Sequence, residues 1–508
     1  MNVILTIFNW LFHSYEEFCE LNLTYFKLFG LFQMVNPYNR VSNRSQQIWL
    51  FAHGFFIVFT SAHTFLQIVS LFVASHSYQQ LMNTFTHVGN WFIASYKYLN
   101  FVRSRHRLQA LFDVFRMDFL HVSKFKDRKD ILFDNAYRCN WFILLYVSIC
   151  LSTCVVWNLY PLAELIYYSV VMHSKFMTSL DVDGNATGIA STTIYRPKNI
   201  LDSWYPFDSS TGTLFYCVYV YEFFIYMHML FAFCCYDSYL FSMFTMMTAQ
   251  FQVLYDSFSD IGYDKPIRGY NPHLDALSLF KPEQTLHLIR EKLFKSIKSE
   301  CRLDHLKLLR SEQLIVDSTK PEKFKYMRGH EETEKAQEFH DSLLESVEDL
   351  QKANNYANEL IEVYNDVIVF QVLISIITVC LMAFQATVYF SVVDDDEFTG
   401  TFQISKSLLY FGCAFLLLYL SCLCSGDLND VRKSINGAFY NAHWHEFKLP
   451  DALKRDILFS MTCSQRTHVV EITHRFPIDL HTFTEISEVC FSYFTFLLNY
   501  YKKKGVSN

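Results

Sequence analysis

The chain has 508 residues, 51% of them hydrophobic and 18% charged, with 51 Phe and 32 Tyr but only 14 Gly and 10 Pro. This composition, with its positive mean hydropathy of +0.12, is typical of a membrane protein with several spans and excludes a set of ordinary soluble domains. The net charge of −7, without a basic domain or zinc-finger spacing, excludes nucleic acid as an expected partner.

Apolar stretches long enough to cross a bilayer, which takes about 20 helical residues, occur seven times. In chain order they cover residues 48–74, 82–102, 137–160, 214–254, 363–390, 404–424 and 484–501. The second stretch contains a charged residue, Lys97. We therefore expect an all-α membrane protein with seven transmembrane helices, whose two ends lie on opposite sides of the membrane.

The distribution of Lys and Arg predicts the orientation. Most of the 43 basic residues fall in the N-terminal segment and in residues 103–138, 259–360 and 426–481. Because basic residues collect in cytoplasmic segments, the N-terminus is expected inside and the C-terminus outside. This orientation is opposite to that of a G-protein-coupled receptor, whose Asp/Glu-Arg-Tyr and Asn-Pro-x-x-Tyr motifs are also absent from the third and seventh stretches.

The orientation divides the chain into seven parts. These are a cytoplasmic N-terminal segment (1–47), four spans with an outer loop at 161–213 (48–258), a long cytoplasmic loop and helix (259–362), two spans (363–424), cytoplasmic anchor helices (425–481), the last span (482–501) and an extracellular tail (502–508). The glycosylation sequon that falls on the outer side is the one at Asn185.

Several segments predict a helical bundle in the cytoplasm. The fourth apolar stretch has about 41 residues, or about 60 Å of helix, so half of it extends beyond a hydrocarbon core of about 30 Å. Residues 341–362 and 426–481 have amphipathic patterns that fit such a bundle. Residues 286–303 are basic and amphipathic, which makes calmodulin or anionic membrane lipid a candidate partner; a solvated extension of the bundle is the alternative.

The last apolar stretch carries a stripe of polar residues. At helical spacing the stripe places these side chains on one face: Glu485, Glu488, Ser492, Thr495 and Asn499. Because polar groups are costly in lipid, that face is expected to point at water or protein. Two readings remain open, a pore built from several copies of this helix and a helix buried inside a bundle.

Enzyme signatures are absent from the sequence. It contains no His-Glu-x-x-His, no Gly-x-Ser-x-Gly, no P-loop and no dinucleotide-binding glycine run. His443 and His445 flank Trp444, and side chains two residues apart on a helix diverge rather than chelate. We expect no catalytic activity, no cofactor and no metal.

Several motifs resemble those of the insect odorant receptor family. They are Ser203-Trp-Tyr-Pro-Phe-Asp208 before the fourth span, Ala383 to Thr387 in the fifth, Ala438, Tyr440 and Trp444 before the seventh, the run 464–483 and Ser492 to Leu498 in the seventh. The resemblance is strongest over 427–501, and the Trp-Tyr-Pro-Phe-Asp form resembles a ligand-tuned subunit rather than the shared co-receptor.

The resemblance implies an odorant-gated cation channel in the plasma membrane of sensory neurons. In such a channel four subunits surround a pore lined by their seventh helices, and the chain assembles with the co-receptor or with itself. Phe496 and Tyr500 match the family's two apolar gate positions. The alternatives are a gustatory-type channel, whose Gln-containing ending this chain lacks after Leu498, a metabotropic receptor, and a transporter, which would show internal inverted repeats.

The family's pocket for a small apolar ligand lies in the outer halves of the second to sixth spans. The candidates here are Trp91, Phe92 and Ser95 on the second span, Cys150, Thr153 and Trp157 on the third, Tyr219 and Phe223 on the fourth, and Ile377, Cys380 and Phe384 on the fifth. Such a site is concave and mostly aromatic with few polar groups. Ordinary helix packing is the alternative for each of these residues.

Overall fold

The computed structural model of the protein describes most of the chain as helix. It covers residues 30–35, 42–73, 78–114, 129–182, 199–201, 203–209, 212–261, 330–392, 397–442, 444, 449–464, 470–472 and 476–505. The glycosylation sequon at Asn185 and the basic amphipathic segment 286–303 lie outside these residues, so both stay predictions.

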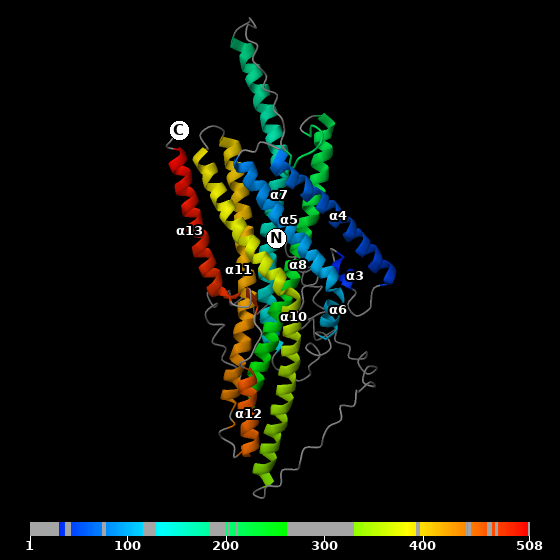
Figure 1. The fold of residues 1–508 in the computed structure, drawn as a ribbon, viewed down its shortest axis with the longest axis vertical. Coiled ribbons are helices and arrows are strands. Elements are labelled where there is room, and N and C mark those ends of the chain that lie inside the picture. The colour runs from blue at the N-terminus through cyan, green and yellow to red at the C-terminus, as the bar shows by residue number, and fades with distance from the viewer. Residues whose placement is uncertain are drawn as a thin grey trace. The chain divides into compact units, whose positions relative to one another are not determined.

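Each predicted span is one long helix (Figure 1). The seven are α4 (Asn43–Val73), α5 (Tyr78–Arg103), α7 (Lys129–Val182), α8 (Gly212–Ser259), α10 (His330–Val392), α11 (Glu397–Asn441) and α13 (Leu480–Gly505). The shorter elements are α3 (Leu31–Val35), α6 (Arg105–Val114), α12 (Asp451–Ser464) and an antiparallel pair of two-residue strands, β1 (Glu471–Ile472) and β2 (Phe476–Pro477). The predicted fold class, an all-α membrane protein, is confirmed.

Among the described helices, α4, α7, α8, α10 and α11 are long and apolar enough by composition to cross a membrane. Helices α5 and α13 have the required length but a lower mean hydropathy, because α5 carries His87, Asn90 and Lys97 and α13 carries the polar stripe. The two helices that are least apolar therefore hold the polar groups that need a protein or water environment.

The helices run across several predicted boundaries. Helix α10 has 63 residues and passes without a break from the predicted cytoplasmic segment into the fifth span, and α11, with 45 residues, continues from the sixth span into the anchor segment. The predicted outer loop 161–213 also begins as helix, because α7 continues to Val182. A continuous helix leaves fewer backbone groups unpaired than two helices joined by a turn, since each helix end exposes four of them.

The chain forms two compact units. The smaller one consists of residues 1–19, 254–350 and 434–465, and its described core packs Phe258 against Phe439 with ring centroids 4.2 Å apart. The faces predicted for the anchor helices are buried here, as Leu343 on α10 and Ala438 on α11 show.

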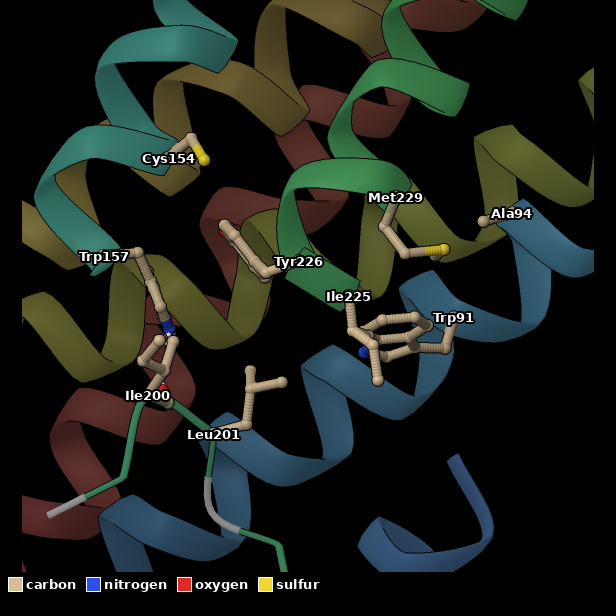
Figure 2. Close-up of a cluster of buried hydrophobic side chains, with 9 residues drawn as sticks. All are labelled: Trp91, Ala94, Cys154, Trp157, Ile200, Leu201, Ile225, Tyr226 and Met229. Atoms are coloured by element: carbon tan, nitrogen blue, oxygen red, sulfur yellow. Dashed lines mark hydrogen bonds between the residues drawn. The ribbon is translucent and has the colours of Figure 1, made fainter. Parts of the chain in front are cut away.

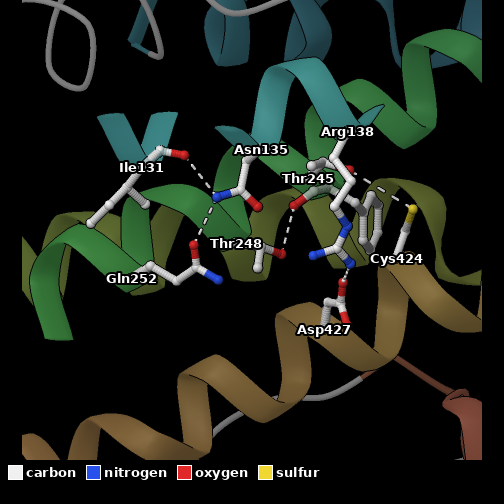
Figure 3. A network of polar contacts seen from close by, with 9 residues as sticks. Ile131, Asn135, Arg138, Thr245, Thr248, Gln252, Cys424 and Asp427 are labelled. Carbon is white, nitrogen blue, oxygen red and sulfur yellow. Dashed lines mark hydrogen bonds and ion pairs between the residues drawn. The ribbon is translucent and has the colours of Figure 1, made fainter. Parts of the chain in front are cut away.

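The larger unit consists of residues 20–253, 351–433 and 466–508 and contains all of α5 and α13. One buried cluster joins α5, α7 and α8 to the segment before α8 (Figure 2): Trp91, Ala94, Cys154, Trp157, Ile200, Leu201, Ile225, Tyr226 and Met229. A polar network near the start of α7 ties it to α8 and α11 (Figure 3). There Arg138 pairs with Asp427 at 2.9 Å, and the Asn135 amide donates to the side-chain oxygen of Gln252 at 2.8 Å.

Candidate functional site

The larger unit contains a cavity of about 100 Å³ lined by α5, α7, α8, α10 and α11. Its lining is mostly aromatic and aliphatic with a few polar side chains. The lining residues are His87, Asn90, Trp91, Tyr146, Cys150, Thr153, Tyr226, Met229, Leu230, Phe233, Ser375, Thr378, Tyr410, Cys413, Ala414 and Leu417. A small, concave and largely apolar space is the usual form of a site for a small apolar ligand.

Small side chains of α7 and α11 face one another at the cavity. Helix α7 contributes Cys150 and Thr153, and α11 contributes Cys413 and Ala414. The Cys150 and Cys413 sulfur atoms are only 3.2 Å apart, so α7 and α11 approach closely at this point. Cys150 and Thr153 are three residues apart, so they share one face of α7.

Hydrogen bonds hold the polar lining residues. The Asn90 amide nitrogen donates to the Thr86 carbonyl at 2.9 Å and to the Tyr410 hydroxyl oxygen at 2.8 Å, which links α5 to α11. The Thr153 hydroxyl donates to the Ile149 carbonyl at 2.8 Å. Because paired polar groups cost little to bury, they can lie in an otherwise apolar wall and orient a bound molecule.

A buried ion pair adjoins the cavity. Lys97 on α5 and Asp237 on α8 form it, with side chains 3% and 0% exposed. The hydroxyl of Tyr146, a lining residue, donates to the second Asp237 oxygen at 2.8 Å. The Lys97 ammonium also lies 4.6 Å from the ring centroid of Phe233, another lining residue. The positive charge of Lys97 in the second span is thus neutralised by Asp237 inside the bundle, as burial in a membrane requires.

The segment that carries the Trp-Tyr-Pro-Phe-Asp motif is held against the bundle by Glu222 on α8. This buried carboxylate accepts hydrogen bonds from the Leu201 backbone N–H at 3.1 Å and from the Tyr205 hydroxyl at 2.8 Å. Burial, and then the Glu222 carboxylate, raises the pKa of Tyr205, so its phenol stays a neutral donor. The Trp157 indole N–H donates to the Ile200 carbonyl at 3.2 Å, which connects the same segment to the cavity's surroundings.

Of the candidate pocket residues, Trp91, Cys150 and Thr153 line the cavity. Trp157 stands behind the lining, with its ring centroid 4.7 Å from that of His87 and 5.4 Å from that of Tyr410. Tyr219 and Phe223 pack on the outside of the buried cluster of Figure 2.

The other candidates lie elsewhere. Phe92 and Ile377 are exposed at 52% and 42%, so they lie on outer faces of α5 and α10. Phe384 is buried, and Ser95 half-buried, outside the lining. Cys380 packs next to α13 instead.

Sequence reasoning missed most of the lining. On α10 the expected pocket residues lay on the helix face of Ile377, whereas Ser375 and Thr378 line the cavity. On α11 no pocket residue was expected. The available signal was the spacing of Tyr410, Cys413, Ala414 and Leu417 along the sixth span, which marks one helix face.

Helix α13 packs on α10 and α11 by one face. Cys490 is buried with Val379 and Ala414, and the Phe483 ring lies 5.2 Å from that of Phe415 between centroids. The five residues of the polar stripe lie on the opposite face and are all exposed, as is Phe496 at 65%. The stripe is therefore not buried within this chain's own bundle.

No group of three His, Cys, Asp or Glu side chains that could hold a metal ion occurs among the described residues. Taken together, the fold and the cavity define a multi-pass helical membrane protein with a largely apolar cavity inside its helical bundle. Residues 77–491 match the sequence model of the 7tm Odorant receptor family. The chain belongs to this family, as its motifs suggested.

Known relatives agree with this assignment. Odorant receptor 2a of Drosophila melanogaster is 28% identical over 123 residues, which are 24% of this chain and 30% of that protein. The match therefore spans less than a third of that relative's length. The insect olfactory receptor OR5 from Machilis hrabei, in complex with eugenol, has a similar structure with a TM-score of 0.59 and 14% identity. The superposition covers 94% of this chain and 98% of OR5. A second structure of OR5 matches with a TM-score of 0.58. At this identity the likeness concerns the fold.

Proposed function

We propose that the protein is a subunit of an odorant-gated, non-selective cation channel. The observation that carries the proposal is the polar face of α13, which lies opposite its packed face and is exposed in the single subunit. An exposed polar stripe on a membrane helix is costly in lipid, so it needs water or a partner. One helix cannot enclose a pore, whereas four symmetrically placed copies can line one with these stripes.

The stripe supplies groups suited to cations. Glu485 and Glu488 would form acidic rings at one end of the pore, and Ser492, Thr495 and Asn499 would replace part of an ion's hydration shell. Phe496 borders the stripe and, with Tyr500 one turn later on the same flank, would form the closed gate by excluding water. A small rotation of α13 would exchange these apolar groups for polar ones.

The cavity is the proposed ligand site. Its size and lining suit a small apolar odorant, and the eugenol bound by OR5 is a ligand of this kind. Ala414 lines the cavity and also packs with Cys490 of α13, so one residue of α11 separates the proposed site from the proposed pore helix. Ligand opens the channel if it binds the open arrangement more tightly than the closed one.

The assembly and location follow from the family and the charge distribution. We infer a heterotetramer with the odorant receptor co-receptor, or a homotetramer, in the plasma membrane of sensory neurons, with the N-terminus inside. The exposed apolar side chains of α4, among them Phe51 and Phe72, would face lipid. The anchor helices of the smaller unit would hold the subunits together on the cytoplasmic side.

Patch recording from cells that express the chain, with and without the co-receptor, tests the proposal. An odorant panel should evoke a current that reverses near zero with sodium and potassium and shifts when a large organic cation replaces them. A Ser492→Cys variant should lose current to a water-soluble, thiol-reactive methanethiosulfonate, whereas the native chain, whose Cys490 is on the packed face, should not. A second-messenger response without any such current would contradict a channel.

A further inference from the structure

We propose that the cavity selects odorants that carry a hydrogen-bond acceptor, such as small ketones, aldehydes and esters, and that the Tyr410 hydroxyl is the group that recognises it. The inference rests on the proposed function, because it assumes that the cavity of the larger unit is the ligand site. It adds to that function a chemical class of ligand and one specificity-determining residue.

The hydrogen bonds of Asn90 fix which atom of this pair donates. One atom of the Asn90 amide lies 2.9 Å from the Thr86 carbonyl oxygen and 2.8 Å from the Tyr410 hydroxyl. A carbonyl oxygen can only accept, so this atom must be the NH₂ nitrogen rather than the amide oxygen. Its two protons are then used, one on Thr86 and one on Tyr410.

Tyr410 is consequently an acceptor in this contact, and its own proton remains to be placed. A phenol has one O–H, and in the part of the chain that the structure describes no protein acceptor is shown for it. Tyr410 lines the cavity, so the free proton has the cavity as its available direction. A ligand with an acceptor oxygen would complete the chain from the Thr86 carbonyl through Asn90 and Tyr410.

The surroundings make this one bond selective. The Tyr410 ring lies among aromatic rings, with centroids 5.4 Å from Trp157 and 5.9 Å from His87. In such an apolar setting a donor without a partner is costly, so a ligand that lacks the acceptor is rejected more strongly than it would be in water. The neighbouring Thr153 hydroxyl does not compete, because it donates to its own helix.

The other lining residues and the volume of the cavity determine the size and the apolar part of the ligand. Met229, Leu230, Phe233 and Leu417 offer apolar contacts. At about 100 Å³ the cavity is smaller than the engineered cavity of about 150 Å³ that binds benzene. A compact ring or a short chain with one carbonyl or ester oxygen therefore fits the site best.

Matched ligand pairs provide the test. Each pair contains a ketone and the alkene in which a methylene replaces the oxygen, for example cyclopentanone and methylenecyclopentane, and patch recording gives the half-maximal concentration of both. The wild-type channel should respond to the ketone at an about tenfold lower concentration, as one hydrogen bond in an apolar site allows. In Tyr410→Phe that ratio should fall toward one, because the alkene no longer leaves a buried donor unpaired and the ketone no longer gains a hydrogen bond.

Tyr226→Phe, Ser375→Ala and Thr378→Val serve as controls, because these described residues are the other cavity hydroxyls for which no hydrogen bond is shown. Tyr226→Phe is the matched control, since it removes the same phenol oxygen from the same cavity. All three variants should keep the ketone preference. An unchanged ratio in Tyr410→Phe, or loss of the ratio in any control, overturns the proposal. The wild-type ratio needs no variant, so a channel that prefers the alkenes also overturns it even if Tyr410→Phe does not reach the surface. No current with any pair or odorant contradicts the channel assignment itself.

Discussion

The cavity and α13 use polar side chains in opposite ways. Around the cavity several polar groups are paired between helices, as in the bonds of Asn90 to Tyr410 and of Tyr146 to Asp237. On α13 the polar stripe is exposed and Thr495 bonds only back to its own helix at Phe491 among the contacts shown. A lone subunit therefore pairs polar groups across helices in the first region and leaves the second exposed. The difference supports the proposal that the cavity lies within one subunit and that the polar face of α13 takes part in an assembly.

The largest expected effect concerns the ion pair beside the cavity. Lys97→Met or Asp237→Asn alone should destabilise the folded protein by about 3–5 kcal/mol, because removing one partner leaves the other charge or polar group buried without compensation. The double variant should recover much of that loss. The thermal midpoint of detergent-solubilised protein, read by fluorescence-detected size exclusion, measures both. Equal loss in single and double variants would show that shape rather than charge matters at this point.

The second prediction concerns the apolar flank of the α13 stripe. Phe496→Ala and Tyr500→Ala should each raise the current without ligand several-fold, because a smaller side chain widens an apolar constriction and lets water enter. Recording the current before and after the odorant measures the basal fraction.

Phe491→Ala is the matched control, since Phe491 is an exposed ring on the other flank of the same helix. It should leave the basal current unchanged. If all three variants reach the surface with wild-type basal current, the closed gate is not on α13.

The third prediction separates the cavity from ordinary packing. Trp157→Ala should shift the response toward bulkier ligands or abolish it, because the ring supports His87 and Tyr410 from behind. Phe384→Ala removes an equally buried ring that is absent from the lining, so it should leave the rank order of odorants unchanged. Concentration–response curves over one panel compare the two. The same change of rank order in both variants would indicate a general loosening of the bundle.

The sequence predicted α13 better than the cavity, for a physical reason. The stripe from Glu485 to Asn499 is a property of one helix, so its spacing alone predicts which side chains share a face. The seven spans and the all-α fold class were predictable in the same way, because each span is a local run of apolar residues.

The cavity depends on the register between helices. The Asn90 to Tyr410 contact joins residues that are 320 positions apart, and no local spacing shows that these two turns meet. A shift of one residue decides whether Ile377 or Thr378 faces the cavity, which is why the α10 residues expected in the pocket lie off the lining while Cys150 and Thr153 on α7 lie on it.

The smallest expected effect comes from the acidic end of the stripe. Glu488 is exposed on α13, and four copies in a ring would concentrate cations at the mouth of the pore. Glu488→Gln keeps the size of the side chain and removes the charge, so the single-channel conductance should fall by a fraction, more at low than at high ionic strength, because salt screens charges over about 10 Å at 0.1 M. Ligand potency should not change, since the cavity is untouched. A conductance that does not depend on this charge at low salt would place Glu488 outside the ion path, and the polar face of α13 would then be a contact between subunits instead of a pore wall.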